Sequence, residues 1–235
     1  KFNLASAATI ETAGDTLSFT GGTINLANSA NLTMTTTGGA ITVNGVVGDS
    51  SETVSISAGS GNTVTETVNI TGDIGNANEI LSVAITAQDG ITLTGGGSGI
   101  TIDTADDTDP NISFTGPVTV SGGVTVTSDN STNDGTLGFS STIDGAGGTD
   151  NLTIQSGTGA LTLTGIIGAG TSLDTLNINT DAGTAAITIA GLGDTDAAGA
   201  ITTNIGNSTT SNMTFGGTYF RSSGDLTVTT AAGAG

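Results

Sequence analysis

The sequence contains no cysteine, no histidine and no tryptophan, and each absence removes a class of chemistry. Without cysteine there are no disulfides, thiol nucleophiles or thiolate metal sites. Without histidine there is no His-ligated zinc site and no Ser-His-Asp triad. Aromatic residues make up only 3% of the chain, so large rings cannot dominate a core. We therefore expect a protein that is not an enzyme.

Basic residues are almost as scarce, because Lys1 and Arg221 are the only two in 235 residues and the net charge is -19. A chain with so few cations cannot neutralise phosphates, which excludes nucleic-acid binding. The same shortage argues against binding to anionic membranes. No apolar run approaches the ~20 residues that a membrane-spanning helix needs, so we expect no direct membrane insertion.

The residues that are present favour β-structure. Glycine is abundant, with 39 residues, and the apolar residues are mainly Val, Ile, Leu and Ala. Thr supplies much of the remainder, and Val, Ile and Thr all favour strands. Apolar and polar residues alternate strictly over short segments, a pattern that a disordered chain has no reason to keep.

A five-residue motif recurs along the chain: apolar, polar, apolar, polar and then usually Gly. Successive copies begin 21 to 27 residues apart, on average about 24 to 25, within the range of solenoid repeats. The copies are LSFTG from Leu17, ITVNG from Ile41, VNITG from Val68, ITLTG from Ile91, ISFTG from Ile112, LGFSS from Leu137, LTLTG from Leu161, ITIAG from Ile187 and MTFGG from Met213.

A longer match supports the repeat. NLTMTTTGGAITVNGVVG from Asn31 aligns without gaps to NLTIQSGTGALTLTGIIG from Asn151. DLTVTTAAGAG from Asp225 begins in the same way. We expect residues 1–235 to form one continuous solenoid segment within a longer array.

Each repeat is predicted to hold three short strands whose apolar side chains point to one face. The motif is one strand. A second strand precedes it, with inward residues Leu32/Met34, Val54/Ile56, Leu81/Val83, Ile100/Ile102, Val124/Val126, Leu152/Ile154 and Leu176/Ile178. A third follows it, with Ile24/Leu26, Val46/Val47, Val118/Val120, Ile143, Ile166/Ile167 and Leu192.

A single repeat buries too few side chains to offset the conformational entropy that it loses on folding. Stacked repeats pair each strand with its equivalents above and below, which satisfies the backbone and joins the apolar pairs into columns. We therefore predict a right-handed parallel β-helix of about nine coils with the motif copies in one column. The Gly of each motif is expected at a corner, with positive φ or in close contact with the next coil. The alternative is an antiparallel sandwich, which the scarcity of Asn-Gly turns disfavours.

The remaining catalytic option is a pair of carboxylates, as in carbohydrate-active β-helix enzymes. The chain lacks an aromatic sugar platform and the cations that a polyanionic glycan would need. Catalysis of that kind is the weakest of the alternatives.

One acidic loop is a candidate calcium site and the only cofactor site that the sequence suggests. The segment DTADDTDP contains Asp103, Asp106, Asp107 and Asp109. Several carboxylates on one loop can bind Ca²⁺, although acidic turns are also common because Asp caps local amides. The Gly/Asp-rich segments DGAGGTDN from Asp144 and GDTDAAG from Gly193 are expected to be plain turns.

The outward residues of the motif strands form a second candidate surface. A flat lattice of paired Thr resembles the ice-binding face of solenoid antifreeze proteins, but Thr is also simply a good polar strand residue. The predicted files are Ser18, Thr42, Asn69, Thr92, Ser113, Thr162, Thr188 and Thr214, and beside them Thr20, Asn44, Thr71, Thr94, Thr115 and Thr164.

The segments GALTLTGIIG and GTAAITIAGLG, with Gly/Ala/Asp connectors, resemble the repeats of large bacterial surface proteins. The similar families are autotransporter passengers and filamentous-haemagglutinin-like adhesins. The resemblance implies export to the cell surface and a structural or adhesive role as a rod, fibre or sheath. We expect self-association, head to tail, or a cell-surface or glycan ligand as partner.

Overall fold

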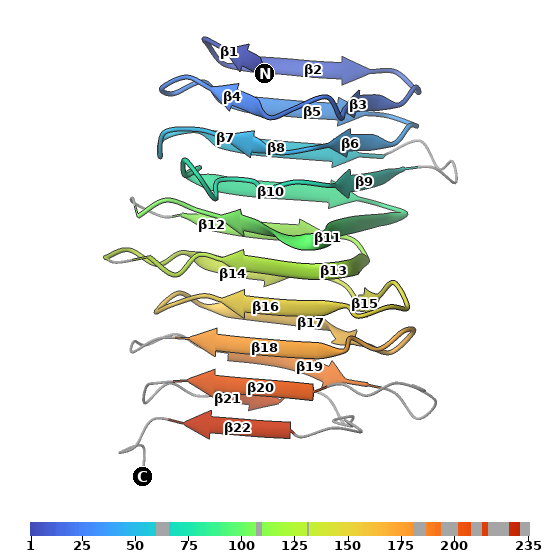
Figure 1. The fold of residues 1–235 in the computed structure, drawn as a ribbon, viewed down its shortest axis with the longest axis vertical. Helices are drawn as coiled ribbons and strands as arrows, with labels where there is room; N and C mark the ends of the chain where they lie inside the picture. Colours follow the sequence, from blue (N-terminus) through green and yellow to red (C-terminus); the bar gives the residue numbers. More distant parts are fainter. Residues whose placement is uncertain are drawn as a thin grey trace.

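The computed structural model is a ladder of short strands stacked along one axis, with the chain winding from one end to the other (Figure 1). It describes residues 1–59, 66–106, 110–130, 132–180, 187–193, 202–207, 213–215 and 226–230. These residues form an all-β parallel solenoid of about seven turns, without a helix. None of them belongs to a helix long and apolar enough to cross a bilayer. Nine turns were expected; β19–β22 continue the ladder, but the segments joining them lie outside the described residues.

The strands form three columns in which the strands of successive turns pair in parallel, with register shifts only in the β11–β13 and β17–β19 pairings among the described strands. The first column contains β2 (Ala8–Thr12), β5 (Leu32–Thr36), β8 (Thr53–Ala58), β10 (Ser82–Ala87), β12 (Asn111–Thr115), β14 (Thr136–Phe139), β17 (Leu161–Ile167), β19 (Ile187–Leu192) and β21 (Met213–Phe215).

The other two columns share their longest strands, which turn a corner between them. The second column contains β3 (Leu17–Phe19), β6 (Ile41–Val43), β9 (Thr67–Ile70), the first parts of β11 (Gly90–Asp103) and β13 (Val118–Thr127), and β15 (Ile143–Gly145). The third contains β1 (Phe2–Leu4), β4 (Ile24–Leu26), β7 (Val46–Val47), the second parts of β11 and β13, β16 (Asn151–Gln155), β18 (Thr175–Thr180), β20 (Thr202–Asn207) and β22 (Leu226–Thr230). Isolated bridges at Ile74 join β7 to β11 in this column.

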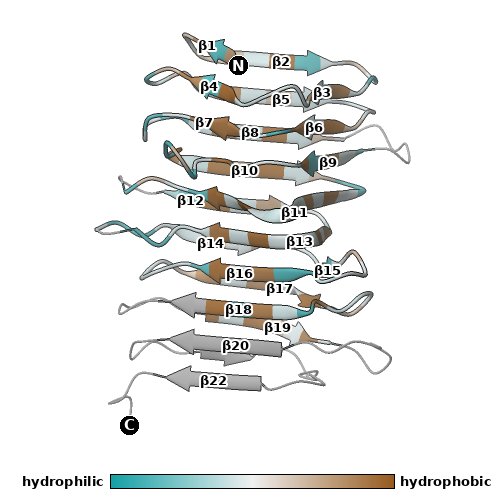
Figure 2. Cartoon of the chain, viewed as in Figure 1, coloured by the Kyte–Doolittle hydropathy of each residue, from teal (hydrophilic) through white to brown (hydrophobic). Residues whose placement is uncertain are grey.

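The core lies between the three columns and consists of stacked aliphatic side chains. In β5, Leu32 and Met34 are fully buried, whereas Thr33 and Thr35, each one residue after them, face outward and are only partly covered. This alternation produces the apolar bands that cross the strands (Figure 2). Phe114 and Phe139 stack with ring centroids 4.6 Å apart, so even the rare aromatics follow the register of adjacent turns. The strand assignment and the inward alternation predicted from the sequence are thus confirmed.

The prediction that all motif copies share one column is wrong. Ile41 and Ile91 belong to one file of the second column, linked through Val68. Leu161 and Ile187 pair with each other in the first column. All four are fully buried, so each lies in the interior, but in two different files.

The two long matching segments show the same shift by one face. The copy from Asn31 supplies β5, β6 and β7 to the first, second and third columns. The copy from Asn151 supplies β16 to the third column and then β17, which begins in the first and ends at Ile167 in the second. Equivalent sequence therefore occupies different faces of the rod.

The shift arises where one strand of a repeat is missing. Most repeats run through a long strand, a motif strand and a short strand. After the motif strand that begins at Ile91, the segment GGGSG leads directly into the long strand at Ile100, without a short strand between. The pairing of β11 with β13 changes register between Thr94 and Gly96 and again between Gly96 and Ile100. From here on, each part of the sequence repeat lies one face earlier in the winding order.

The fold tolerates this shift because its three faces impose the same requirements. Each needs a strand with two inward aliphatic residues, spaced about 4.8 Å from its neighbours.

Three further inward assignments are corrected at the ends of strands. Leu81 and Val47 are only partly buried, and Ile166 is 37% exposed, while the residues Val83, Val46 and Ile167 point inward.

The motif glycines lie at corners where successive turns come close, as predicted. A Cβ on Gly72 would overlap the carbonyl oxygen of Asn44 in the preceding turn. At the equivalent position of the first turn, a Cβ on Gly21 would meet no atom within 4 Å. Neither residue has a positive φ, so the difference between the two positions is purely steric.

We predict that Gly72→Ala destabilises the rod by roughly 3 kcal/mol, because its methyl group must displace backbone rather than a flexible side chain. Gly21→Ala, at the same motif position, should change stability by about 0.5 kcal/mol or less. Urea unfolding followed by circular dichroism measures both. Equal effects of the two substitutions would show that these corners are not sterically constrained.

Candidate functional site

The predicted calcium residues are described only in part. Asp103 ends β11 and Asp106 lies in the following turn, whereas Asp107 and Asp109 lie outside the described residues. The carboxylate of Asp106 accepts hydrogen bonds from the amides of Thr132 and Asn133, at 3.1 and 2.8 Å, in the next turn. Within the described part of the chain, no group of three or more acidic residues is arranged to hold a metal ion. Calcium binding by all four residues stays a prediction.

Asp103 lies in an unfavourable electrostatic environment. The pKa of Asp103 is raised from 3.8 to about 6, mainly by burial and in addition by the nearby carboxylates of Glu79 and Asp129. The three acidic residues come from successive turns at the corner between the third and first columns. At neutral pH the corner is therefore a line of like charges that opposes folding.

Asp150 has the opposite role, because it holds two turns together. Its carboxylate accepts hydrogen bonds from the amides of Gly147 and Gly148 in its own turn and of Gly122 in the preceding turn, at 2.8, 3.0 and 2.9 Å. Only 2% of the residue is exposed. Burial alone would raise the pKa of Asp150, but these amide donors outweigh it and hold the pKa below the ordinary value of 3.8. The carboxylate thus replaces water for three backbone groups at a corner.

Other carboxylates cap amides between turns in the same way. Glu52 is fully buried and accepts hydrogen bonds from the amides of Ser29 and Asp49, at 2.7 and 2.6 Å. Asp134 accepts from the amide of Thr158, and Asp144 from that of Gly170. The turns of this acidic rod therefore use many of its carboxylates as structural groups.

The outward face of the first column carries mainly Thr and Ser. The files predicted for ice binding are split: Ser18, Thr42, Asn69 and Thr92 lie on the second column, and Ser113 begins the part on the first column. The corrected first-column files are Thr9, Thr33, Ser55, Ala84, Ser113, Gly138, Thr162 and Thr188, and beside them Glu11, Thr35, Ser57, Thr86, Thr115, Ser140, Thr164 and Ala190. Glu11 is the only charged residue among these positions.

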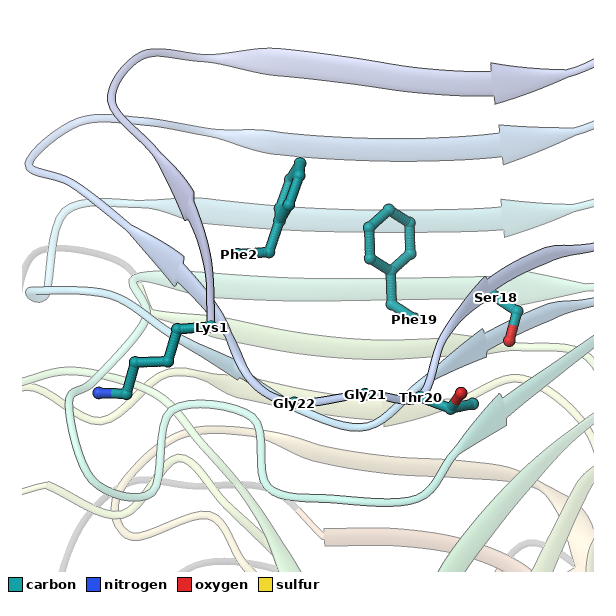
Figure 3. Close-up of a pocket in the computed structure, with 7 residues that line it drawn as sticks. All are labelled: Lys1, Phe2, Ser18, Phe19, Thr20, Gly21 and Gly22. Atoms are coloured by element: carbon teal, nitrogen blue, oxygen red, sulfur yellow. The ribbon is translucent and has the colours of Figure 1, made fainter.

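The first described turn lies at one end of the ladder. Strands β1, β2 and β3 each pair with one neighbour in the described structure, so their outer edges lack a partner strand. Phe2 and Phe19 pack at 5.4 Å between ring centroids beside a hollow of about 320 Å³, while Lys1 points away from the rings (Figure 3). Phe2 is 45% exposed, and Leu4, Ile10, Leu17 and Phe19 are only partly buried.

Sequence analysis missed the carboxylate caps and assigned one of their segments only a passive role. DGAGGTDN is a turn, as expected, but its Asp144 and Asp150 both bind amides of neighbouring turns. The available signal was the recurrence of Asp or Glu beside Gly at corners. It does not say which turn supplies the amides. The segment GDTDAAG lies outside the described residues beyond Gly193.

We predict opposite effects for two Asp→Asn substitutions. Asp150→Asn should destabilise the rod by about 2 to 3 kcal/mol at neutral pH, because an amide accepts fewer of the three hydrogen bonds and presents a donor to them. This stabilisation in the native chain should be lost as the pH falls below 3.8. Asp103→Asn should instead stabilise by about 1 kcal/mol above pH 6, after allowance for solvent screening.

The gain from Asp103→Asn should shrink as the pH falls from 6 towards 3.8, because the native Asp103 then takes up its proton. Thermal melts across this pH range measure both variants. The matched control is Asp174→Asn, which changes an exposed Asp in the next turn. Destabilisation by Asp103→Asn at neutral pH, or a neutral Asp150→Asn, would contradict the assigned roles.

Comparison with known proteins adds no identification to this geometry. No family model matches the chain, and searches of curated proteins and of solved structures find no match either. The fold is therefore established as a parallel β-solenoid without an assigned family.

Proposed function

We propose that the chain is a rigid rod segment or fibre subunit of a bacterial cell surface, with a structural and adhesive role and no catalytic activity. The resemblance of its repeats to autotransporter passengers and filamentous-haemagglutinin-like adhesins motivates the extracellular location. The absence of cysteine and histidine is consistent with that location and with a role that does not need catalysis.

The observation that carries this proposal is the parallel, in-register stacking of turns, a pattern that a further turn can continue beside the first described turn. In the described structure, the outer strand edges of that turn have unpaired backbone donors and acceptors, and its partly buried Leu4, Ile10, Leu17 and Phe19 are the top layer of the core. A further turn of the same kind satisfies both at once, by parallel pairing and by burial of the apolar layer. The proposed occupant is another solenoid turn, which makes end-to-end stacking the mode of self-association.

The stacking proposal predicts that the chain forms rods whose length grows with protein concentration. Leu17→Asp together with Phe19→Asp should abolish this growth, because it places two charges in the apolar layer of the first described turn. The control Ser18→Asp adds a charge to the same strand on its exposed outward face. Sedimentation velocity and negative-stain electron microscopy measure the length.

Circular dichroism would confirm that each variant keeps its strands. A native chain that stays a single particle at high concentration would overturn the fibre-subunit proposal. Equal loss of assembly in the Ser18→Asp control would place the contact elsewhere.

Ice binding is a second candidate, which the corrected first-column face favours. Small hydroxyl-bearing residues repeat there about 4.8 Å apart along the rod and about 6.8 Å apart along each strand. Almost no charge interrupts the lattice, although Glu11, Ala84, Gly138 and Ala190 break the files. A regular and nearly neutral face is suited to binding ice, whose surface is also regular and uncharged.

If this face binds ice, the chain should slow ice growth in a thermal-hysteresis assay. Thr162→Lys on the first column should abolish the effect, because a long charged side chain interrupts the flat surface. Thr92→Lys on the second column should leave it unchanged. Absence of thermal hysteresis in the native chain would end this alternative without affecting the rod proposal.

A further inference from the structure

A polar groove lies beside the point where the sequence repeat shifts by one face. It has a volume of about 340 Å³ and crosses four successive turns. Asp73 and Asn76 contribute to it from the third turn and Ser98 from the GGGSG segment that replaces the missing short strand. Thr125 and Asn151 line it in the following turns. Breaks in an otherwise regular pattern are where functional sites are expected.

The groove has no side chain at one outward position, Gly123. Gly123 pairs with Asn151, so it occupies an outward position at which a side chain would otherwise stand. A Cβ on Gly123 would meet only the Cα of Gly99, at an ordinary contact distance of 3.5 Å. Gly123 has no positive φ, so neither sterics nor backbone conformation requires glycine here.

The polar groups of the groove differ from similar groups elsewhere on the rod. Asn31 accepts a hydrogen bond from Thr53, Asn69 from Thr94, and Asn25 donates to Asn3, so these asparagines link adjacent turns. In the described structure, no side-chain hydrogen bond of this kind is made by four residues that line the groove, Thr101, Thr125, Asn151 and Thr153. Their amide and hydroxyl groups line the groove and do not link adjacent turns.

Asp73 is held in place at one side of the groove. Its Oδ1 accepts the amide of Thr101 at 2.8 Å, and its Oδ2 accepts the side-chain amide of Asn76 at 3.0 Å. Both oxygens keep a further lone pair for a hydroxyl donor. The groove thus combines an oriented carboxylate with hydroxyl and amide groups of Asn76, Thr125 and Asn151.

We infer that this groove binds an uncharged oligosaccharide that lies along the rod axis. Hydroxyl, amide and carboxylate groups match the donors and acceptors of a neutral sugar chain. No basic residue lines the groove, and the chain carries a charge of -19, so an anionic glycan is repelled. No aromatic ring lines it either, so affinity at a single site is weak and depends on many sites along an assembled rod. This inference names a ligand class for the adhesive role and rests on that part of the proposed function.

The test uses the soluble, unassembled chain titrated with neutral hexasaccharides of glucose, mannose and N-acetylglucosamine, and with a heparin-derived hexasaccharide as the anionic probe. Binding is followed by NMR chemical-shift changes. We expect at least one neutral probe to bind and the anionic probe not to bind. Gly123→Thr should fill the groove and weaken binding by roughly tenfold or more. Asn151→Ala should weaken it by a smaller factor.

The matched control is Gly138→Thr, which adds the same side chain at an outward, open glycine of the first column. It should leave binding unchanged. Stronger binding of the anionic probe, equal binding by Gly123→Thr, or no binding of any neutral probe at about 10 mM would overturn the inference. Because the measurement uses single particles, its failure is separate from a failure of end-to-end stacking.

Discussion

Parallel, in-register pairing between successive turns is the interaction on which the whole structure depends. A strand of three to six residues with two inward aliphatic side chains has no independent stability. Stacked about 4.8 Å from its equivalents, the same strand satisfies its backbone on both sides and extends a continuous apolar file. This explains how a chain with 3% aromatic residues and no disulfide builds a continuous apolar core. It also explains why any turn of the ladder can pair with a further turn of the same kind.

The requirement for pairing concerns a position in a column and not a particular sequence. The three faces accept long, motif and short strands interchangeably, so loss of one short strand after Ile91 shifts the repeat without breaking any file. The cost is local and falls on the GGGSG segment. There the regular surface is interrupted, and the interruption leaves a groove lined by polar groups that the fold does not use. Structural redundancy elsewhere gives this one segment freedom to differ.

At the corners the backbone leaves the ladder, so its amides need other hydrogen-bond acceptors. Asp150 and Glu52 supply them from buried positions, and they join turns that are distant in sequence. The same corners also contain Asp103, whose charge is a liability near Glu79 and Asp129. A high content of acidic residues therefore has two opposite effects on stability. Which effect applies depends on whether amide donors or other carboxylates surround each residue.

The sequence by itself determined the solenoid, the strands and their inward residues, because a two-residue alternation repeated every 24 or so residues has few other ways to bury its apolar side. It also placed Gly72 at a corner through its motif, whereas the need for a small residue there comes from Asn44 in the preceding turn. Only the tertiary structure decided which face each strand joins, and therefore which Thr residues share a surface. The physical reason is that the three faces are nearly equivalent in energy, so local sequence cannot distinguish them, and a single omitted strand changes every later assignment. The tertiary structure likewise decided that Asp150 accepts a hydrogen bond from the preceding turn. It also decided that Asn151 lies beside Gly123, with no side-chain partner there.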